Sequence, residues 1–166
     1  MPQIKIREWN EMPRTKLRFI KIGDIFCYQF SEEMFVFGQI LGKVNVGHVI
    51  QFFDFFQASP TITVEELSRA QFIGKPIIVD SYTLFDRNPV WSWQIIGHQV
   101  DFDPSPFKDL AFKWGDPNGS HFGKVWLDGR REPKIFSREE VEDLDWEACV
   151  GSIVYNRILE EELASR

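Results

Sequence analysis

Apolar residues in the first third of the chain gather in runs that are typical of β-strands. Ile25–Phe30, Met34–Leu41 and His48–Phe56 are rich in aromatic and branched side chains, which favours the strand conformation. The polar connector Ser31–Glu33 predicts a hairpin with a loop of three to five residues between the first two strands. The region Gly42–Gly47 predicts the turn into the third strand.

Four shorter runs continue this pattern in the next eighty residues. Pro76–Tyr82 predicts a strand that is entered through a proline, and Trp91–His98 predicts another. Phe112–Trp114 and Lys124–Leu127 are expected to pair across Asp116–Gly119, because Asp, Pro, Asn and Gly are the common turn formers.

Two segments match a capping box, the signature of a helix start. In Thr63–Glu66 and Ser137–Glu140 the first hydroxyl and the fourth carboxylate can each accept a hydrogen bond from the other residue's backbone N–H. A short helix is expected to run from the first box to about Gln71. A last helix is expected over Ser152–Leu163, where apolar residues recur at helical spacing.

Together these elements predict an α+β fold in a single domain. We expect a twisted, mainly antiparallel β-sheet or half-barrel with a few helices, two of them near the C-terminus. A length of 166 residues suits one domain. Its predicted parts are an arm at residues 1–16 that Trp9 anchors, a β-rich body at 17–136 and an acidic helical tail at 137–166.

The run Phe52–Phe56, with Asp54 at its centre, has two interpretations. Aromatic side chains dominate the energetics of many interfaces, so the run could contact a partner. Phe is more often buried, and a strand that is covered on both faces would bury such a run completely. We favour the core interpretation.

The net charge of −6 comes from the end of the chain. Residues 137–166 contain nine acidic and three basic residues, whereas the other 136 residues contain sixteen of each. An acidic protein repels the phosphate backbone of nucleic acids. The segregation instead favours a protein partner with a basic surface.

No arrangement of residues predicts catalysis or a cofactor. His48, His98 and His121 lie too far apart for a known metal motif, and the chain has neither a nucleophile elbow nor a phosphate-binding loop. Five aspartates could form catalytic pairs in space, although such residues more often accept structural hydrogen bonds; they are Asp54, Asp80, Asp86, Asp101 and Asp103.

The two cysteines and the apolar pattern bear on localisation. Cys27 and Cys149 are expected to be buried, reduced thiols in a cytoplasmic protein, with a disulfide between them as the less favoured alternative. No stretch approaches the roughly 18 apolar residues of a membrane span. The charged first residues do not resemble a secretory signal.

Several short motifs, in this order and spacing, resemble the immunity protein 26 family of bacterial polymorphic toxin systems. They span about Trp9 to Gln99 and comprise Trp9–Asn10, Pro13–Phe26, Phe37–Ile40, Val46–Val49, Phe52–Asp54, Ile77–Arg87 and Trp93–Gln99. The resemblance implies a cytoplasmic protein that binds a toxin's effector domain and protects the producing cell. It implies no catalytic residue, and it does not extend to the acidic tail.

We therefore expect an immunity protein without enzymatic activity, as a monomer or weak homodimer, that binds a toxin with a basic surface. The alternatives are a small carboxylate-dependent hydrolase and a scaffold or regulatory module without a toxin. A partner-specific surface should differ between family members, so the tail is the candidate for toxin contact. The candidate toxin-binding residues are Glu139, Glu142, Asp143, Asp145, Trp146 and Glu147.

Overall fold

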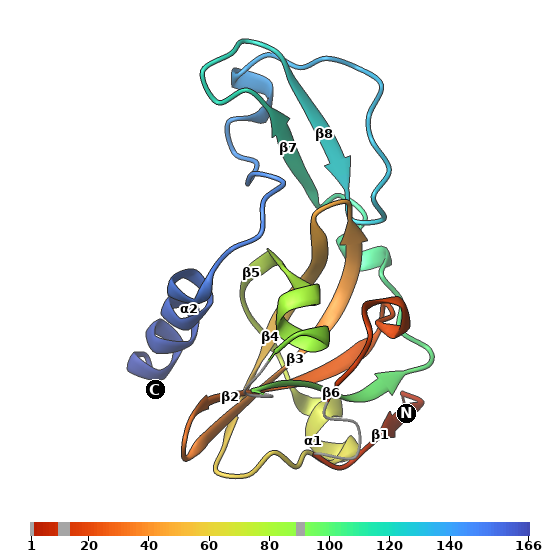
Figure 1. Ribbon diagram of the computed structural model, residues 1–166, viewed down its shortest axis with the longest axis vertical. Helices are drawn as coiled ribbons and strands as arrows, with labels where there is room; N and C mark the ends of the chain where they lie inside the picture. Colours follow the sequence, from red (N-terminus) through yellow and green to blue (C-terminus); the bar gives the residue numbers. More distant parts are fainter. Residues whose placement is uncertain (1, 10–13, 89–91) are drawn as a thin grey trace.

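A six-stranded antiparallel sheet forms the centre of the molecule. The computed structural model describes residues 2–9, 14–88 and 92–166. The sheet has the strand order β1-β6-β2-β3-β4-β5, and a separate hairpin, β7–β8, projects beyond one end of it (Figure 1). The strands are β1 (Ile4–Ile6), β2 (Asp24–Ser31), β3 (Met34–Val44), β4 (Gly47–Gln57), β5 (Phe72–Val79), β6 (Trp93–Gln99), β7 (Ala111–Gly115) and β8 (Phe122–Trp126).

Both faces of this sheet are covered, which explains the long apolar runs. On β4, the neighbours Phe52 and Phe53 belong to different core clusters, and only 1% and 7% of their surfaces are exposed. Successive side chains of a strand point to opposite faces, so each cluster fills one side of the sheet. The core interpretation of the Phe52–Phe56 run is confirmed for these two residues, while Phe55 and Phe56 are half-buried.

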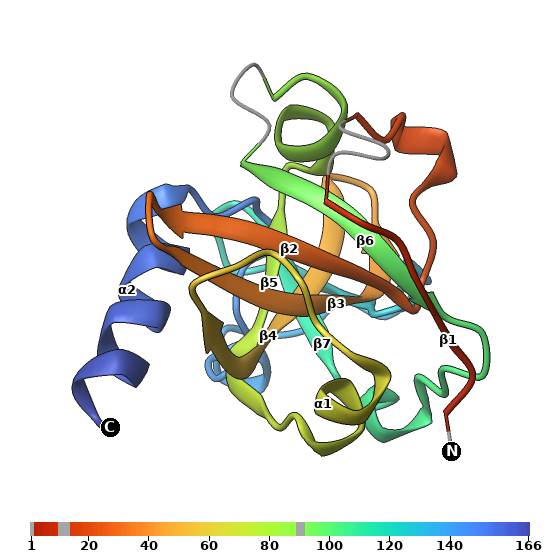
Figure 2. The ribbon, with the colours of Figure 1, turned by 90° about the horizontal axis from the view of Figure 1, so that it is seen from below.

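The helices cover different faces of the sheet. Helix α1 (Val64–Arg69) contributes Leu67 to the cluster that contains Phe53. Helix α2 (Ser152–Ala164) contributes Tyr155 and Leu159 to the cluster that contains Phe52. Figure 2 shows the two helices well apart. The remaining helical turns are short: η1 (Leu17–Phe19), η2 (Tyr82–Asp86), η3 (Ser105–Phe107) and η4 (Glu139–Val141).

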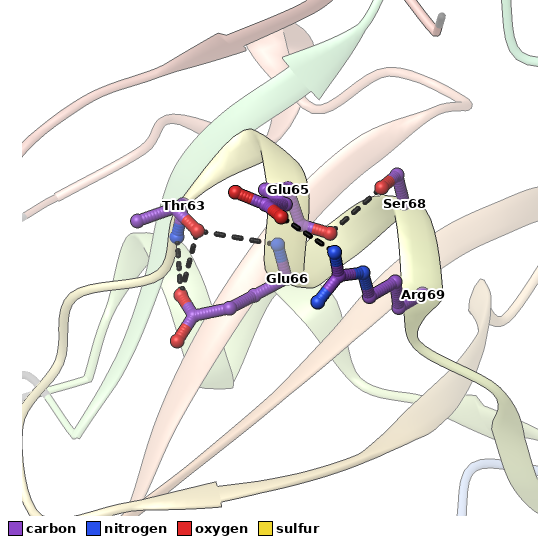
Figure 3. Close-up of polar contacts among 5 residues, drawn as sticks. All are labelled: Thr63, Glu65, Glu66, Ser68 and Arg69. Carbon is purple, nitrogen blue, oxygen red and sulfur yellow. Dashed lines mark hydrogen bonds and ion pairs between the residues drawn. The ribbon is translucent and has the colours of Figure 1, made fainter.

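The first predicted capping box is present at the start of α1 (Figure 3). The Thr63 hydroxyl accepts a hydrogen bond from the Glu66 backbone N–H at 3.2 Å, and the Glu66 carboxylate accepts one from the Thr63 N–H at 2.7 Å. These bonds lower the pKa of Glu66. An ion pair between Arg69 and Glu65, one turn apart, lies on the solvent side of the same helix.

The structure confirms the α+β class and most strands, with local corrections. Ser31 pairs with Met34, so the β2–β3 loop has two residues rather than three to five, because a bulge between Gln29 and Ser31 shifts the register. The turn between β3 and β4 is shorter than expected, since Gly42 lies within β3.

Two strands begin in places that the pattern did not indicate. Strand β5 begins at Phe72 and ends before Tyr82, with Pro76 inside it. Proline is tolerated there because β5 is an edge strand with an irregular register opposite β4. Strand β1 lies within the predicted arm, where it pairs with β6.

Other expectations on the N-terminal part of the chain are met in part. Trp9 packs edge-on against Phe35 with ring centroids 5.5 Å apart, so it does anchor the arm. Residues 10–13 of the arm, which carry part of the family resemblance, lie outside the described residues. So does Trp91, the start of one predicted strand, and β6 is described from Trp93.

The end of the chain and the cysteines also differ in detail from the expectation. Of the two helices near the C-terminus, α2 is an α-helix, whereas the first is the single 3₁₀ turn η4. Both cysteines are free; Cys27 is buried as expected, but Cys149 is exposed. Among the described residues, no helix is both long and apolar enough to span a membrane.

Candidate interaction surface

The β7–β8 hairpin stands on the end of the main sheet. Ala111 pairs with Trp126 at its base, and Gly115 pairs with Phe122 next to the turn. The predicted turn is present, since the Gly119 N–H donates to the Asp116 carbonyl at 2.9 Å. The base is fixed by a third core cluster, which contains Leu41, Val44, Val49, Ile78, Phe112, Val125 and Leu127.

The chain after β8 folds back onto both edges of this hairpin (Figure 1). On the β8 edge, Phe122 and Phe136 exchange backbone hydrogen bonds of 3.0 and 2.8 Å. On the β7 edge, the Lys113 N–H donates to the Asp145 carbonyl at 2.8 Å, and the Lys113 carbonyl accepts from the Glu147 N–H at 2.7 Å. The first part of the acidic tail is therefore held against the hairpin along its length.

The second capping box is also present, at the start of η4. The Ser137 N–H donates to the Glu140 carboxylate at 2.8 Å, and the Glu140 N–H donates to the Ser137 hydroxyl at 3.4 Å. Backbone hydrogen bonds and contacts with Ser137 lower the pKa of both Glu139 and Glu140. Both carboxylates are therefore charged at neutral pH.

Three of the six candidate residues carry a carboxylate that no ion pair neutralises. Glu139, Glu142 and Asp143 are exposed. No ion pair within 4.0 Å joins any of them to another described residue. The η4 turn and the two residues after it thus place these three carboxylates close together along the chain.

Two other candidates are already paired within the protein. Asp145 forms an ion pair of 2.7 Å with Lys75 on β5. Glu147 forms one of 2.7 Å with Arg131, and only 3% of the Glu147 side chain is exposed. These two residues hold the segment against the sheet and the hairpin, and their charges are already neutralised by ion pairs within the protein.

The sixth candidate, Trp146, is an exposed aromatic side chain within this region. It is 37% exposed, and the Lys113 ammonium lies 5.1 Å from its ring centroid. Trp114, also on the hairpin, is 40% exposed and lies under the Arg131 guanidinium at 4.9 Å. Ile135 is 65% exposed, so the region offers apolar anchors as well as charge.

The folded structure brings basic residues next to the acidic tail, so the net negative charge of this region is smaller than that of the tail segment alone. Residues 111–136 carry five basic and three acidic residues, and Arg131 and Lys134 of this stretch pair with Glu147 and Glu140. Sequence reasoning missed these partners because it divided the chain at residue 136. An excess of basic residues just before an acidic segment is the signal that could have indicated them.

The five aspartates that an enzyme could have used act as structural acceptors. Each accepts a hydrogen bond from a backbone N–H: Asp54 from Gln71, Asp80 from Thr83, Asp86 from Leu17, Asp101 from Gln3 and Asp103 from Ser105. Asp86 also forms an ion pair with Arg14 at 2.6 Å, and the hydrogen bonds lower its pKa. Within the described ranges, no three His, Cys, Asp or Glu side chains gather as metal ligands would.

Comparison with known families shows a match to a family of immunity proteins. The sequence model of a family described as immunity protein 26 matches residues 21–122, which is more than half of the chain. The match confirms the resemblance from Lys21 onward and extends it past Gln99 to the start of β8, while the motifs before Lys21 lie outside the matched residues. Neither a curated protein nor a solved structure matches the chain.

Proposed function

The chain belongs to the immunity protein 26 family, and from this premise we propose that it binds a cognate toxin and neutralises it by covering the toxin's effector domain. The family match is the observation that carries this proposal. An occluding protein acts by binding alone, so we propose no catalytic role for it. The site of action would be the cytoplasm of the cell that it protects.

The surface that we propose for toxin contact comprises the β7–β8 hairpin and residues 131–147. It combines exposed aromatic side chains, Trp114 and Trp146, with the unpaired carboxylates of Glu139, Glu142 and Asp143. Aromatic anchors supply most of the binding energy in many protein interfaces. Unpaired charges speed the encounter with a partner of opposite charge.

We propose two different roles for the candidate residues. Glu139, Glu142, Asp143 and Trp146 would contact a toxin with a basic surface. Asp145 and Glu147 would instead keep the segment in place through Lys75 and Arg131. Such an interface should bury about 800 Å² on each partner.

Co-expression with the product of the neighbouring gene tests the function. We expect the chain to rescue growth from that protein's toxicity and to co-purify with it. If it does neither, the immunity role is wrong, and a scaffold without a toxin becomes the better explanation.

Charge reversal tests the surface. The double variant Glu142→Lys/Asp143→Lys should weaken toxin binding at least about tenfold, mainly through slower association, with less effect at high salt. The matched control is Glu160→Lys/Glu161→Lys, which reverses two exposed acidic residues on α2. Equal effects of the two double variants would show that only net charge matters and would contradict the proposed surface.

Truncation of an anchor tests the apolar contribution. Trp146→Ala should raise the Kd for the toxin roughly tenfold or more, because exposed aromatics are frequent hot spots. Ile153→Ala removes a side chain that is 75% exposed on α2 and should leave the Kd unchanged. An unchanged Kd for Trp146→Ala would remove this residue from the interface.

A further inference from the structure

A cavity lies at the edge of the sheet opposite β5. It is a cavity of about 480 Å³ between β1, β2, β6 and the chain before β2. Its lining includes Lys5, Arg7, Lys21, Asp24 and His98. None of these residues belongs to the proposed toxin-binding surface.

Strand register places three of these residues in one row. Lys5 on β1 lies directly opposite His98 on β6, and His98 lies directly opposite Asp24 on β2. Directly opposed residues of antiparallel strands project to the same face of the sheet, with Cβ atoms about 5 Å apart. The ammonium, the imidazole and the carboxylate are therefore gathered by the sheet itself, which is a rigid support.

Asp24 positions the imidazole. Its carboxylate lies 2.8 Å from His98 Nδ1 and accepts a hydrogen bond of 2.7 Å from the Lys21 N–H. Only 7% of the Asp24 side chain is exposed, against 32% for His98. The carboxylate is thus engaged behind the ring, and Nε2 is the ring nitrogen that is left for the cavity.

The charge of the lining is positive. It contains the ammonium groups of Lys5 and Lys21 and one carboxylate, and that carboxylate is buried. No ion pair within 4.0 Å joins Lys5 or Lys21 to another described residue. The first 21 residues hold six basic and two acidic residues, so the surrounding chain adds to the positive potential.

We propose that this cavity binds an oxyanion, a phosphate or carboxylate group. Lys5 and Lys21 supply the charge, and His98, when protonated, supplies a directed N–H donor through Nε2. The group belongs either to a free small molecule or to an acidic side chain of the toxin. The proposal does not depend on the β7–β8 surface.

Titration with inorganic phosphate and with malonate, followed by NMR of the histidine ring protons, tests the site. The chain has three histidines, of which His48 is buried and His121 is exposed far along the sequence, so both serve as internal references. We expect saturable shifts of the His98 signals with a Kd below about 1 mM at low salt. His48 and His121 signals should stay in place.

Three lysine variants separate a built site from general attraction. Lys5→Met and Lys21→Met should each weaken binding roughly fivefold or more. Lys16→Met changes the net charge equally, in the same stretch of chain, but Lys16 does not line the cavity, and binding should stay within about twofold. Circular dichroism checks that each variant is folded.

The toxin distinguishes the two sources of the anion. If Lys5→Met and Lys21→Met weaken toxin binding and phosphate competes with the toxin, the group is a toxin side chain. If these variants lose phosphate binding but retain toxin binding, the ligand is a free anion. The proposal is overturned if the wild-type protein binds neither probe and neither Lys5→Met nor Lys21→Met changes toxin affinity. It is also overturned if Lys16→Met weakens binding as much as the cavity variants do.

Discussion

At the β7–β8 end of the molecule acidic residues are in excess, whereas around the β1–β6 edge basic residues are in excess. At the acidic end, three of the carboxylates form ion pairs with basic side chains of the same chain; they belong to Asp145, Glu147 and Glu140. At the basic edge, Lys5 and Lys21 line a cavity, and no ion pair within 4.0 Å joins either lysine to another described residue. The charge that a sequence carries and the charge that a surface presents are therefore different quantities.

This difference separates two uses of charge. A salt bridge on the surface contributes little to stability but can hold a segment in position. An exposed unpaired charge adds no attractive contact to the folded state and remains available to a ligand or partner. We expect both ends to act mainly through binding, and one buried group between them to determine how stability depends on pH.

The largest effect is expected at His48 on β4, which belongs to neither end. Burial lowers the pKa of His48 from 6.5 to about 4, and its Nδ1 lies 2.6 Å from the Ser81 hydroxyl. A lowered histidine pKa means that the folded state holds the neutral ring. The stabilisation is complete above pH 6.5 and is lost as the pH falls towards 4.

Urea unfolding at several pH values measures this loss. Between pH 7 and pH 4 the wild-type protein should lose on the order of 3 kcal/mol, as expected for a pKa shift of this size. His48→Gln should be less stable at pH 7 but should show a flatter profile. If the free energy of unfolding of His48→Gln falls as steeply with decreasing pH as that of the wild type, the titrating group is not His48 and is expected at one of the charged ends.

The next largest effect is expected at Arg131, on the acidic end. Arg131→Met removes the partner of a carboxylate that is 3% exposed. Leaving a buried charge unpaired costs about 3–5 kcal/mol in a fully buried site, and we expect about 2 kcal/mol here because Arg131 itself is about one-third exposed. Thermal or urea unfolding measures the change.

Arg130 provides the matched control for this variant. Its ion pair with Asp128 is 3.8 Å long, and about two-thirds of each side chain is exposed. Arg130→Met should therefore change stability by less than about 0.5 kcal/mol. If the two variants behave alike, Glu147 is not held as the structure indicates, and the contrast between paired and presented charge is weakened at this end.

The sheet could be predicted from the sequence because its signals are local. The apolar runs on β2, β3 and β4 and the turn at Asp116–Gly119 depend on neighbouring residues, and all are present in the structure. Strand β1 could not be predicted, since three residues gain strand structure only by pairing with β6. The shortness of the helix after Ser137 could not be predicted from neighbouring residues either. Backbone hydrogen bonds of Phe136 and Asp145 tie the chain to the hairpin on both sides of η4, and this limits the helix to one turn.

The candidate surface divides in the same way. The sequence identified a segment with excess acidic charge and an aromatic residue within it, and Trp146 is indeed exposed. It could not show that Lys75, seventy residues earlier in the chain, neutralises Asp145. The basic cavity was hidden for the same reason, because Lys5, Asp24 and His98 meet only through the register of three strands.

The smallest expected effect is at Lys75, and it tests the contrast directly. Lys75→Met breaks an ion pair in which 64% and 49% of the two side chains are exposed, so the free energy of unfolding should change by less than about 0.5 kcal/mol. The same change leaves Asp145 without its ion-pair partner, while the backbone hydrogen bonds of Lys113 with Asp145 and Glu147 still hold the segment on the hairpin. If the β7–β8 surface meets a basic toxin, the association rate constant should rise about two- to threefold at low salt and return to the wild-type value at high salt.

Stopped-flow or surface plasmon resonance measurements at two salt concentrations give this rate. Lys16→Met makes the same change in net charge at the start of η1, outside the proposed surface, and should leave the rate nearly unchanged. A gain in both variants would mean that the toxin responds to total charge. A higher association rate constant for Lys75→Met alone would show that the toxin approaches the hairpin end, because one additional unpaired carboxylate there is enough to speed association.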